Sequence, residues 1–395
     1  MAKILQIYDI GPPTAHQQAE AISGQILQTS RKLVEMGHQV TYLTGAAPGS
    51  QPQETTDGAE ILRTDLLNLN KKTWNPTKLT AKRQLTFQAT LWRSLKQLLH
   101  FDLYHGHLYS SGLTAHLLAQ LTDNRAVNTI HGSYHPIWPE ITPSTTESAF
   151  YRFAERPLTV YLAKHTAKQI HTASYSQKLA EAWGAPHEKL TLIENGVDTT
   201  TFHPNAEPAP RPPCCRHLIF TARRLVRKNG LEHLLRALPH IRRKHRAHLL
   251  IAGDGPEKQS LTTLARTLGI QKHTTFLGLT PNHNIPSLLT ASDVAVIPSL
   301  IEAPSVFLLE AMATAKPTVA TRVGSIPDVV THMKDGILID PRSPDSIAHA
   351  INLLLQDESL ATTLGKTALR TVTKTHTIHH TARRLSNLYS KILKA

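Results

Sequence analysis

Short apolar runs alternate with longer segments of helical spacing in the first half of the chain. In one such segment Ile22, Ile26, Leu33 and Met36 recur near helical spacing, and Gly37 follows at the position where a helix commonly ends. The apolar runs have the length of strands and end at turn residues. The pattern predicts strands at 4–8, 40–44, 103–105, 126–130, 169–173 and 190–193, and helices at about 16–36, 113–121 and 176–183.

The second half of the chain repeats this alternation. Its apolar pattern predicts strands at 218–222, 249–252, 275–277, 294–298, 318–321 and 337–339, and helices at 231–241, 256–268, 306–315, 347–356 and about 377–393. Strands separated by helices indicate βαβ units and a parallel sheet. We therefore expect an α/β protein with two doubly wound, Rossmann-like domains that face each other across a cleft. Ligands of such sheets bind beyond the carboxyl ends of the strands.

A proline-rich stretch separates the two halves. Five prolines fall within residues 204–213, a composition that favours an extended linker over a helix or a central strand. We expect one domain at 1–203 and another at 204–376. Cys214 and Cys215, at the end of this stretch, are the only cysteines, so no disulfide framework is expected and both are interpreted as linker residues.

Composition narrows the class of protein. The 395 residues suffice for two domains of about 100–200 residues each. No apolar run approaches the roughly 18 residues of a membrane span, and the opening residues lack a signal-peptide pattern, so we expect a cytoplasmic protein. The net charge of +14 favours anionic ligands, but aromatic residues are not interleaved with the basic ones, and no nucleic-acid partner is expected. We expect no metal site, because no H-x-x-x-H helix motif with a glutamate base is present.

One candidate site follows the predicted strand 294–298. Glu302 lies in the loop after this strand, and Ser305 is a good N-cap for a helix whose first turn begins at Val306. The N-terminus of that helix would attract an anion. Glu310 lies inside the same apolar helix, where a carboxylate is costly unless it has partners such as sugar hydroxyls. The alternative is that Glu310 lies on an exposed edge of the helix.

Further candidates follow other strands. Arg223, Arg224, Arg227 and Lys228 come after the strand 218–222 and could hold a diphosphate, although a solvated basic loop has the same composition. The remaining candidates are glycine turns, suited to a tight turn or to a close approach of the backbone to a ligand, and histidines beyond strand ends, suited to bind a hydroxyl. They are Gly253, Asp254 and Gly324, and His105, His107 and His131.

These loops together resemble the retaining family four glycosyltransferases, which have the GT-B fold. Glu302 and Glu310 match the E-x(7)-E motif of that family. Further segments match it in order and at the right spacing, namely 36–40, 193–198, 202–204, 251–256 and 276–278. The resemblance implies an enzyme that transfers a hexose from a nucleoside-diphosphate sugar of the UDP, GDP or ADP type to an acceptor hydroxyl with retention. It implies a sugar, lipid-linked or small-molecule acceptor, bound mainly by the first domain, and no cofactor beyond the donor substrate.

The resemblance also implies residue roles. Arg223 or Arg224, with Lys228, would hold the donor diphosphate, helped by the backbone from Ser305 and Val306 onward. Glu310 would bind the ribose and Glu302 the donor sugar, and His131 would lie beside that sugar. Gly253 and Asp254 would belong to the nucleotide site of the second domain. The terminal helix, about 377–395, would return to the first domain.

The sequence departs from the family pattern in two loops. The glycine-rich loop after the first strand is not plain, and Gly11-Pro12-Pro13 and Ser23-Gly24 are both candidates for it. Asn229 follows Lys228 before Gly230, which leaves open whether Arg223 or Arg224 binds phosphate. Pro304 should stiffen the loop after Glu302.

Three alternatives remain beside this interpretation. The basic and apolar segment 71–99 could contact the inner membrane face peripherally or form a solvated helix. The enzyme could be a GT-B synthase acting on a sugar phosphate, a sucrose-type synthase or a phosphorylase. The chain could also be a non-enzymatic basic protein that binds nucleic acid or lipid.

Overall fold

The computed structural model describes most of the chain, in the following ranges: 1–9, 21–45, 50–64, 96–133, 135, 138, 145–213, 216–302 and 305–395. Several sequence-based predictions lie outside these residues: the helix start at 16–20, Gly11-Pro12-Pro13, most of the segment 71–99, Cys214, Cys215 and Pro304. The chain forms two compact units. The first comprises Met1–His135, Ala149–Asn195 and Ile378–Ala395, and the second is formed mainly by Gly196–Thr377.

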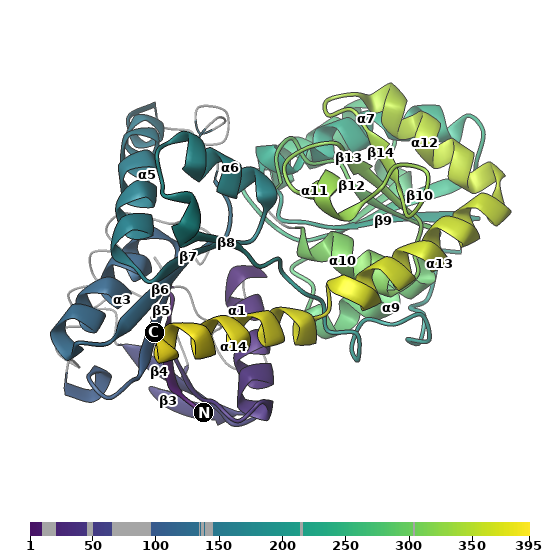
Figure 1. The fold of residues 1–395 in the computed structure, drawn as a ribbon. Coiled ribbons are helices and arrows are strands. Elements are labelled where there is room, and N and C mark those ends of the chain that lie inside the picture. The colour runs from purple at the N-terminus through teal and green to yellow at the C-terminus, as the bar shows by residue number, and fades with distance from the viewer. Residues whose placement is uncertain are drawn as a thin grey trace. The chain divides into compact units, whose positions relative to one another are not determined.

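The first unit is built on a sheet that has eight strands within the described residues, in the order β3-β4-β2-β1-β5-β6-β7-β8 (Figure 1). All neighbouring strands are parallel except β3 and β4. The strands are β1 Lys3–Ile7, β2 Gln39–Gly45, β3 Gln53–Thr56, β4 Ala59–Thr64, β5 Leu103–His107, β6 Arg125–Ile130, β7 Lys168–His171 and β8 Leu190–Leu192. The helices are α1 Ala21–Glu35, α3 Leu108–Thr122, α5 Thr145–His165, α6 Ser174–Ala182 and α14 Ile378–Lys394.

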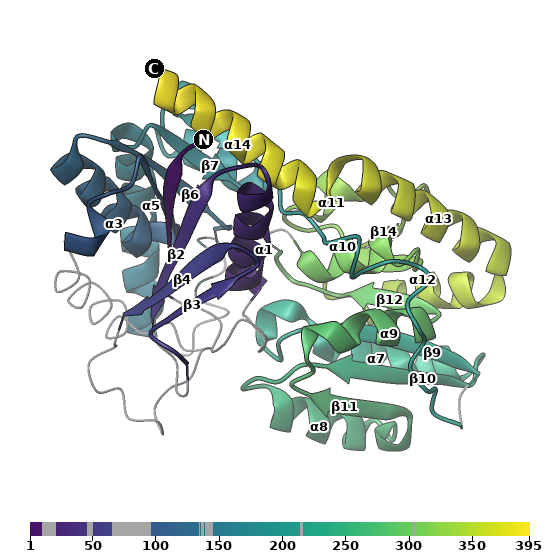
Figure 2. The same ribbon diagram turned by 90° about the horizontal axis from the view of Figure 1, so that it is seen from below.

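The C-terminal helix α14 packs into the core of the first unit. Its buried side chains Ala382, Leu385 and Tyr389 share one apolar cluster with Ile4 of β1 and Leu33 of α1. Arg384 also forms an ion pair of 2.6 Å with Glu194, which follows β8. In both views α14 runs beside α1 (Figures 1 and 2). The last residues of the chain are therefore part of the first unit's fold.

The second unit contains a parallel sheet of six strands among the described residues, in the order β11-β10-β9-β12-β13-β14 (Figure 2). Two separate apolar clusters, one with Ile219, Leu249 and Val296 and the other with Phe220, Leu250 and Ile297, contain alternate residues of β9, β10 and β12, so the sheet is buried on both faces. The strands are β9 His217–Ala222, β10 Ala247–Ala252, β11 Thr274–Gly278, β12 Val294–Ile297, β13 Thr318–Thr321 and β14 Ile337–Ile339. The helices are α7 Leu231–Arg242, α8 Lys258–Thr267, α9 Ile285–Ala291, α10 Val306–Ala313, α11 Ile326–Val329, α12 Pro344–Gln356 and α13 Glu358–Thr375.

The apolar pattern predicted most of these elements. Every strand predicted from the sequence is present, with ends that differ by no more than two residues. The pattern missed the hairpin of β3 and β4 and the helices α5, α9, α11 and α13. Among the described residues, no helix has both the length and the apolar character needed to cross a membrane.

Candidate functional site

Four loops interlock at the carboxyl ends of strands in the second unit. They follow β9, β10, β12 and β13, and backbone hydrogen bonds join each of them to a neighbour. The N–H of Leu300 donates to the carbonyl of Lys228 at 2.8 Å, and the N–H of Leu225 donates to the carbonyl of Asp254 at 2.9 Å. The N–H of Ser325 donates to the carbonyl of Glu302 at 3.2 Å. The loops therefore form one structural unit at the sheet edge where ligands of such folds bind.

Two glycines allow this close packing. Gly253 has φ +131°, and a Cβ at this position would collide with the carbonyl oxygen of Arg223. Gly324 has φ +55°, and a Cβ there would collide with the carbonyl oxygen of Glu302. Both glycines were predicted to serve a tight turn or a close approach to a ligand. In the structure they bring one loop backbone against the next.

Arg223 is the hub of the side chains at this edge. Its guanidinium donates to the Ser305 hydroxyl, the Asn229 side-chain oxygen and the Ser299 hydroxyl, each at 3.0 Å, and to the Glu302 carboxylate. The Ser299 hydroxyl also donates to Glu302, at 2.6 Å. The side chains of Arg223 and Glu302 are only 6% and 8% exposed. Such additional hydrogen bonds help to offset the cost of removing a buried charge pair from water.

The two candidate phosphate arginines differ in position. Arg223 is buried inside this network, whereas Arg224 is exposed and Lys228 is half-buried. Asn229, which departs from the family pattern, accepts from Arg223 and donates to the Arg224 carbonyl at 2.6 Å. Asn229 therefore stabilises the loop in which both arginines lie.

Ser305 is the N-cap of α10, as its sequence position predicts. Its hydroxyl accepts from the Leu308 N–H at 3.3 Å, and the helix begins at Val306. The same hydroxyl accepts from Arg223, so the helix N-terminus and the guanidinium lie together. The positive end of the helix dipole and a cation thus adjoin one carboxylate, that of Glu302.

Glu310 is buried on α10, with an exposed fraction of 6%. The alternative of an exposed helix edge is therefore wrong. Removal from water raises the pKa of the Glu310 carboxyl to about 8. At neutral pH this carboxyl is mostly protonated, so it can both donate and accept a hydrogen bond.

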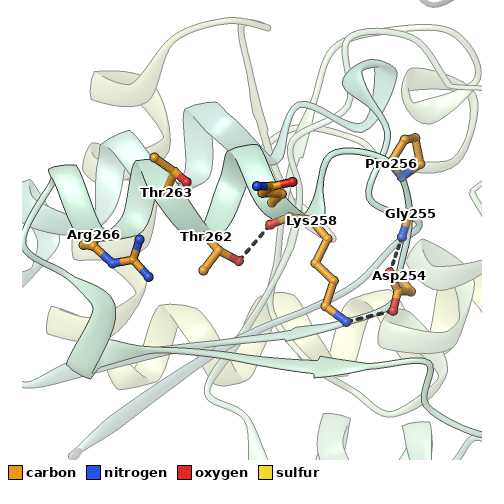
Figure 3. Close-up of a pocket in the computed structure, with 8 residues that line it drawn as sticks. Asp254, Gly255, Pro256, Lys258, Thr262, Thr263 and Arg266 are labelled. Atoms are coloured by element: carbon orange, nitrogen blue, oxygen red, sulfur yellow. Dashed lines mark hydrogen bonds and ion pairs between the residues drawn. The ribbon is translucent and has the colours of Figure 1, made fainter.

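A surface hollow of about 550 Å³ adjoins the Gly253-Asp254 loop (Figure 3). Asp254 accepts from the Lys258 ammonium at 2.9 Å and from the Gly255 N–H at 2.7 Å, and these contacts lower the pKa of its carboxyl, Lys258 contributing most. The lining is formed by this loop and by residues along the length of α8: Asp254, Gly255, Pro256, Lys258, Gln259, Thr262, Thr263 and Arg266. Within the described ranges, no group of three or more histidine, cysteine, aspartate and glutamate side chains is placed to hold a metal ion.

His131 belongs to the first unit and directly follows β6, as predicted. The prediction that His105 and His107 lie beyond a strand end is wrong, because β5 extends to His107 and both side chains are buried in the sheet. His107 Nδ1 lies 2.8 Å from His131 Nε2. Burial lowers the pKa of His131 and of His105 to about 3 and holds that of His107 well below its usual value, so all three imidazoles are neutral at pH 7.

No site role was predicted for three residues of these networks. The side-chain oxygens of Ser299 and Asn229 accept hydrogen bonds from the Arg223 guanidinium, and the Gln6 side-chain oxygen is hydrogen-bonded to His107. The sequence could have indicated Ser299 as a site residue, because it is a polar residue at the carboxyl end of a buried strand. Nothing in the sequence indicated that Gln6 meets His107.

Several solved structures share this arrangement of elements. Sucrose-phosphate synthase from Thermosynechococcus elongatus aligns with a TM-score of 0.87 at 20% identity over 100% of both chains. HepE from Anabaena, in complex with UDP and glucose, aligns with a TM-score of 0.75 at 17% identity over 99% of this chain and 100% of HepE. The chain therefore has the GT-B fold, with two Rossmann-like units.

Two family models match the sequence of this chain. Residues 210–371 match Glycosyl transferases group 1, and residues 23–201 match Glycosyltransferase Family 4. This chain belongs to the GT-B glycosyltransferases of these two families.

Curated relatives match at moderate identity. D-inositol 3-phosphate glycosyltransferase from Corynebacterium glutamicum is 26% identical over 92% of this chain and 90% of its own length. An uncharacterized glycosyltransferase from Methanocaldococcus jannaschii is 30% identical over 58% of this chain. A GDP-mannose-dependent mannosyltransferase from Mycobacterium tuberculosis that acts on phosphatidylinositol monomannoside is 33% identical over 51% of this chain. The last two matches span 61% and 56% of the relatives' own lengths.

Proposed function

We propose that this protein transfers a hexose from a nucleoside-diphosphate sugar to an acceptor hydroxyl with retention of anomeric configuration. The observation that carries the proposal is the buried cluster of Arg223, Glu302 and Ser305 at the start of α10, with Glu310 buried on the same helix. A cation, a helix N-terminus and two carboxyls in one place suit a ligand that combines anionic phosphates with sugar hydroxyls.

Each part of this cluster suits one part of the donor. Arg223, with Arg224 and Lys228 on the same loop, would hold the diphosphate beside the backbone of Ser305 and Val306. Glu310 would bind the ribose, since a protonated carboxyl can accept from one ribose hydroxyl and donate to the other. Gly253 and Asp254 would border the nucleotide on the β10 side. Support for such a donor comes from HepE, which binds UDP-glucose, and from the GDP-mannose-dependent relative.

The transfer itself needs a stabilised leaving group and an activated acceptor. The bond between the anomeric carbon and the diphosphate oxygen breaks, and the acceptor oxygen bonds to the same face of that carbon. The acceptor proton passes to the departing diphosphate oxygen. Arg223, Lys228 and the α10 dipole would neutralise the charge that develops on this oxygen, so the proposed step needs no metal ion. Glu302 would orient the sugar, and His131 would lie beside it.

The acceptor is proposed as a class. The relatives act on D-inositol 3-phosphate and on phosphatidylinositol monomannoside, which are respectively a phosphorylated polyol and a lipid-linked one. The relative with 92% coverage favours the phosphorylated small molecule, in line with a synthase that acts on a sugar phosphate. A lipid-linked acceptor, with peripheral membrane contact, is the second candidate and remains a prediction from the sequence.

A donor and acceptor screen tests this function. The full-length protein is incubated with UDP-glucose, GDP-mannose or ADP-glucose, alone and with inositol phosphate, glucose 6-phosphate or lipid vesicles carrying phosphatidylinositol. We expect the nucleoside diphosphate to be released from one donor, and one acceptor to accelerate that release. An α-linked donor should give an α-linked product. Diphosphate release from none of the donors, with no accelerating acceptor, would contradict the proposal. A β-linked product from an α-linked donor would contradict only the proposed retention of configuration and would leave the proposed hexose transfer intact.

A further inference from the structure

A line of three hydrogen-bonded side chains crosses the interior of the first unit from β1 to the end of β6. The Gln6 side-chain oxygen lies 2.6 Å from His107 Nε2, and His107 Nδ1 lies 2.8 Å from His131 Nε2. The centroids of the two imidazoles are 5.1 Å apart and their planes differ by 26°. All three side chains are buried, with exposed fractions of 2%, 5% and 8%.

The direction of these hydrogen bonds follows from the Gln6 oxygen. An amide oxygen only accepts, so His107 Nε2 carries the proton. A neutral imidazole has a single N–H, and His107 is neutral because burial holds its pKa far below the usual range. His107 Nδ1 is therefore an acceptor and must receive the proton of His131 Nε2. His131 is neutral as well, so its Nδ1 has a lone pair and no proton.

His131 Nδ1 is buried and has no hydrogen-bond partner among the described residues. Such an unpaired acceptor is costly unless a ligand supplies a donor. A nitrogen with a lone pair selects a donor such as a hydroxyl and disfavours a carbonyl or phosphate oxygen. The line from Gln6 therefore determines what kind of group His131 can bind.

A second group of hydrogen bonds lies on the other side of the Gln6 amide. Its nitrogen donates to the Tyr389 hydroxyl of α14 at 3.3 Å. The same hydroxyl lies 2.6 Å from His105 Nδ1, and His105 Nε2 lies 2.6 Å from the Thr129 hydroxyl. If the amide were turned over, every hydrogen bond of the line would reverse, and His131 Nδ1 would become a donor.

We propose that Gln6 and His107 are positioning residues that keep the proton of His131 on Nε2, so that Nδ1 accepts a hydrogen bond from a hydroxyl of the transferred sugar. This inference rests on the proposed function, in which His131 lies beside the donor sugar. It adds a specificity rule: the sugar must present a hydroxyl to Nδ1, and a deoxy or O-methyl analogue at that position leaves the acceptor unpaired.

The tautomer can be measured without any ligand. In full-length protein labelled with 15N-histidine, two-bond nitrogen–proton correlations distinguish the protonated ring nitrogen from the bare one. We expect His131 to carry its proton on Nε2 in the wild type. In Gln6→Met, which removes the acceptor at nearly constant volume, we expect a mixture of His131 tautomers. Assignment uses the signal lost in His131→Phe.

Gln169→Met is a matched control. Gln169 is a fully buried glutamine of the same sheet, and its oxygen accepts from His171 Nε2 at 3.0 Å, outside the line to His131. This variant should disturb the core of the first unit to a similar degree and leave the His131 tautomer unchanged. If Gln6→Met fails to fold, His107→Phe, which keeps a stacked ring but removes the acceptor for His131, replaces it.

The functional arm compares nucleotide sugars with bare nucleotides. UDP-glucose, GDP-mannose and ADP-glucose are each titrated against UDP, GDP and ADP. We expect Gln6→Met to weaken binding of the recognised sugar nucleotide by about 10-fold and to leave binding of the matching diphosphate unchanged. Gln169→Met should change neither.

Three results would overturn the inference: a wild-type His131 with its proton on Nδ1, a tautomer unaffected by Gln6→Met, or equal affinity of wild type and Gln6→Met for the sugar nucleotide. Failure of the proposed function is distinguishable. It would appear as no binding of any nucleotide or nucleotide sugar by the wild type, whatever tautomer the NMR spectra report. That result would also overturn the substrate half of the inference.

Discussion

The guanidinium of Arg223 donates to the carboxylate of Glu302 in the interior of the second unit, and both side chains are more than nine-tenths buried. In the unliganded protein these two charges neutralise each other, and Ser299 and Ser305 complete their hydrogen bonds. An arriving diphosphate would share the guanidinium with Glu302. The ion pair therefore couples the proposed phosphate site to the proposed sugar site.

Removing Glu302 tests this coupling. Glu302→Ala leaves the Arg223 charge buried without its carboxylate, so we expect the free energy of unfolding to fall by about 3 kcal/mol. Glu302→Gln keeps an oxygen acceptor for Arg223 and should cost less. Turnover of the sugar nucleotide should fall by about 100-fold or more in either variant, while affinity for the bare diphosphate changes less. Chemical denaturation, steady-state kinetics and calorimetric titration measure these effects. Equal losses of turnover and diphosphate affinity would contradict the assigned roles.

Gly324 offers a test of the interlocked loops. Gly324→Ala adds a Cβ against the Glu302 carbonyl at φ +55°, so we expect a displaced Glu302 loop, a loss of more than about 1 kcal/mol in stability and weaker nucleotide binding. Gly269→Ala is the control, because Gly269 has a similar φ of +69° but open space around its Cβ position. Equal effects of the two substitutions on nucleotide binding would show that the contact with Glu302 is unimportant.

Glu310 should give the protein a distinctive pH dependence. Its pKa is raised from 4.5 to about 8 by burial, so between these values the folded state binds a proton that the unfolded state lacks. The contribution of Glu310 to stability is complete below about pH 4.5 and is lost as the pH rises towards 8, by at most about 1.4 kcal/mol per pH unit. Relative to wild type, Glu310→Gln should therefore gain stability from pH 5 to pH 8. The exposed Glu207 provides the control Glu207→Gln. Parallel curves for wild type and Glu310→Gln would refute the raised pKa.

Much of the fold was predictable because its sheets are parallel, apart from the β3–β4 pair, and buried on both faces. Continuous apolar runs then locate the strands, as they do for Val294–Ile297. The β3–β4 hairpin lies at the sheet edge and has few apolar residues, although Asp57-Gly58, with φ of +49° and +78°, is a recognisable hairpin turn. Helix α5 contains Pro157, and α13 is rich in threonine, so the local propensity of both opposes the helix that packing stabilises.

The site was predictable only in outline. The rule that ligands bind beyond the carboxyl ends of strands pointed to the loops of Arg223 and Glu302, and the structure brings these two loops into contact. The sequence could not show that Arg223 bonds Glu302, because that contact joins residues 79 positions apart through side-chain geometry. Gln6 and Tyr389 are 383 positions apart and meet only because α14 packs into the core of the first unit. The hydrogen-bond direction at His131 follows from the Gln6 oxygen that faces His107.

The central claim is that the edge of the second sheet with Arg223, Glu302 and Glu310 binds a nucleoside diphosphate. Calorimetric titration of the full-length protein with UDP, GDP and ADP tests this claim most directly, with Glu310→Ala as the site variant and Glu207→Ala as the surface control. The account predicts one-to-one binding of at least one diphosphate, weakened by about 10-fold in Glu310→Ala and unchanged in Glu207→Ala. Absence of binding for all three at millimolar concentration, or equal affinity in Glu310→Ala, would contradict it.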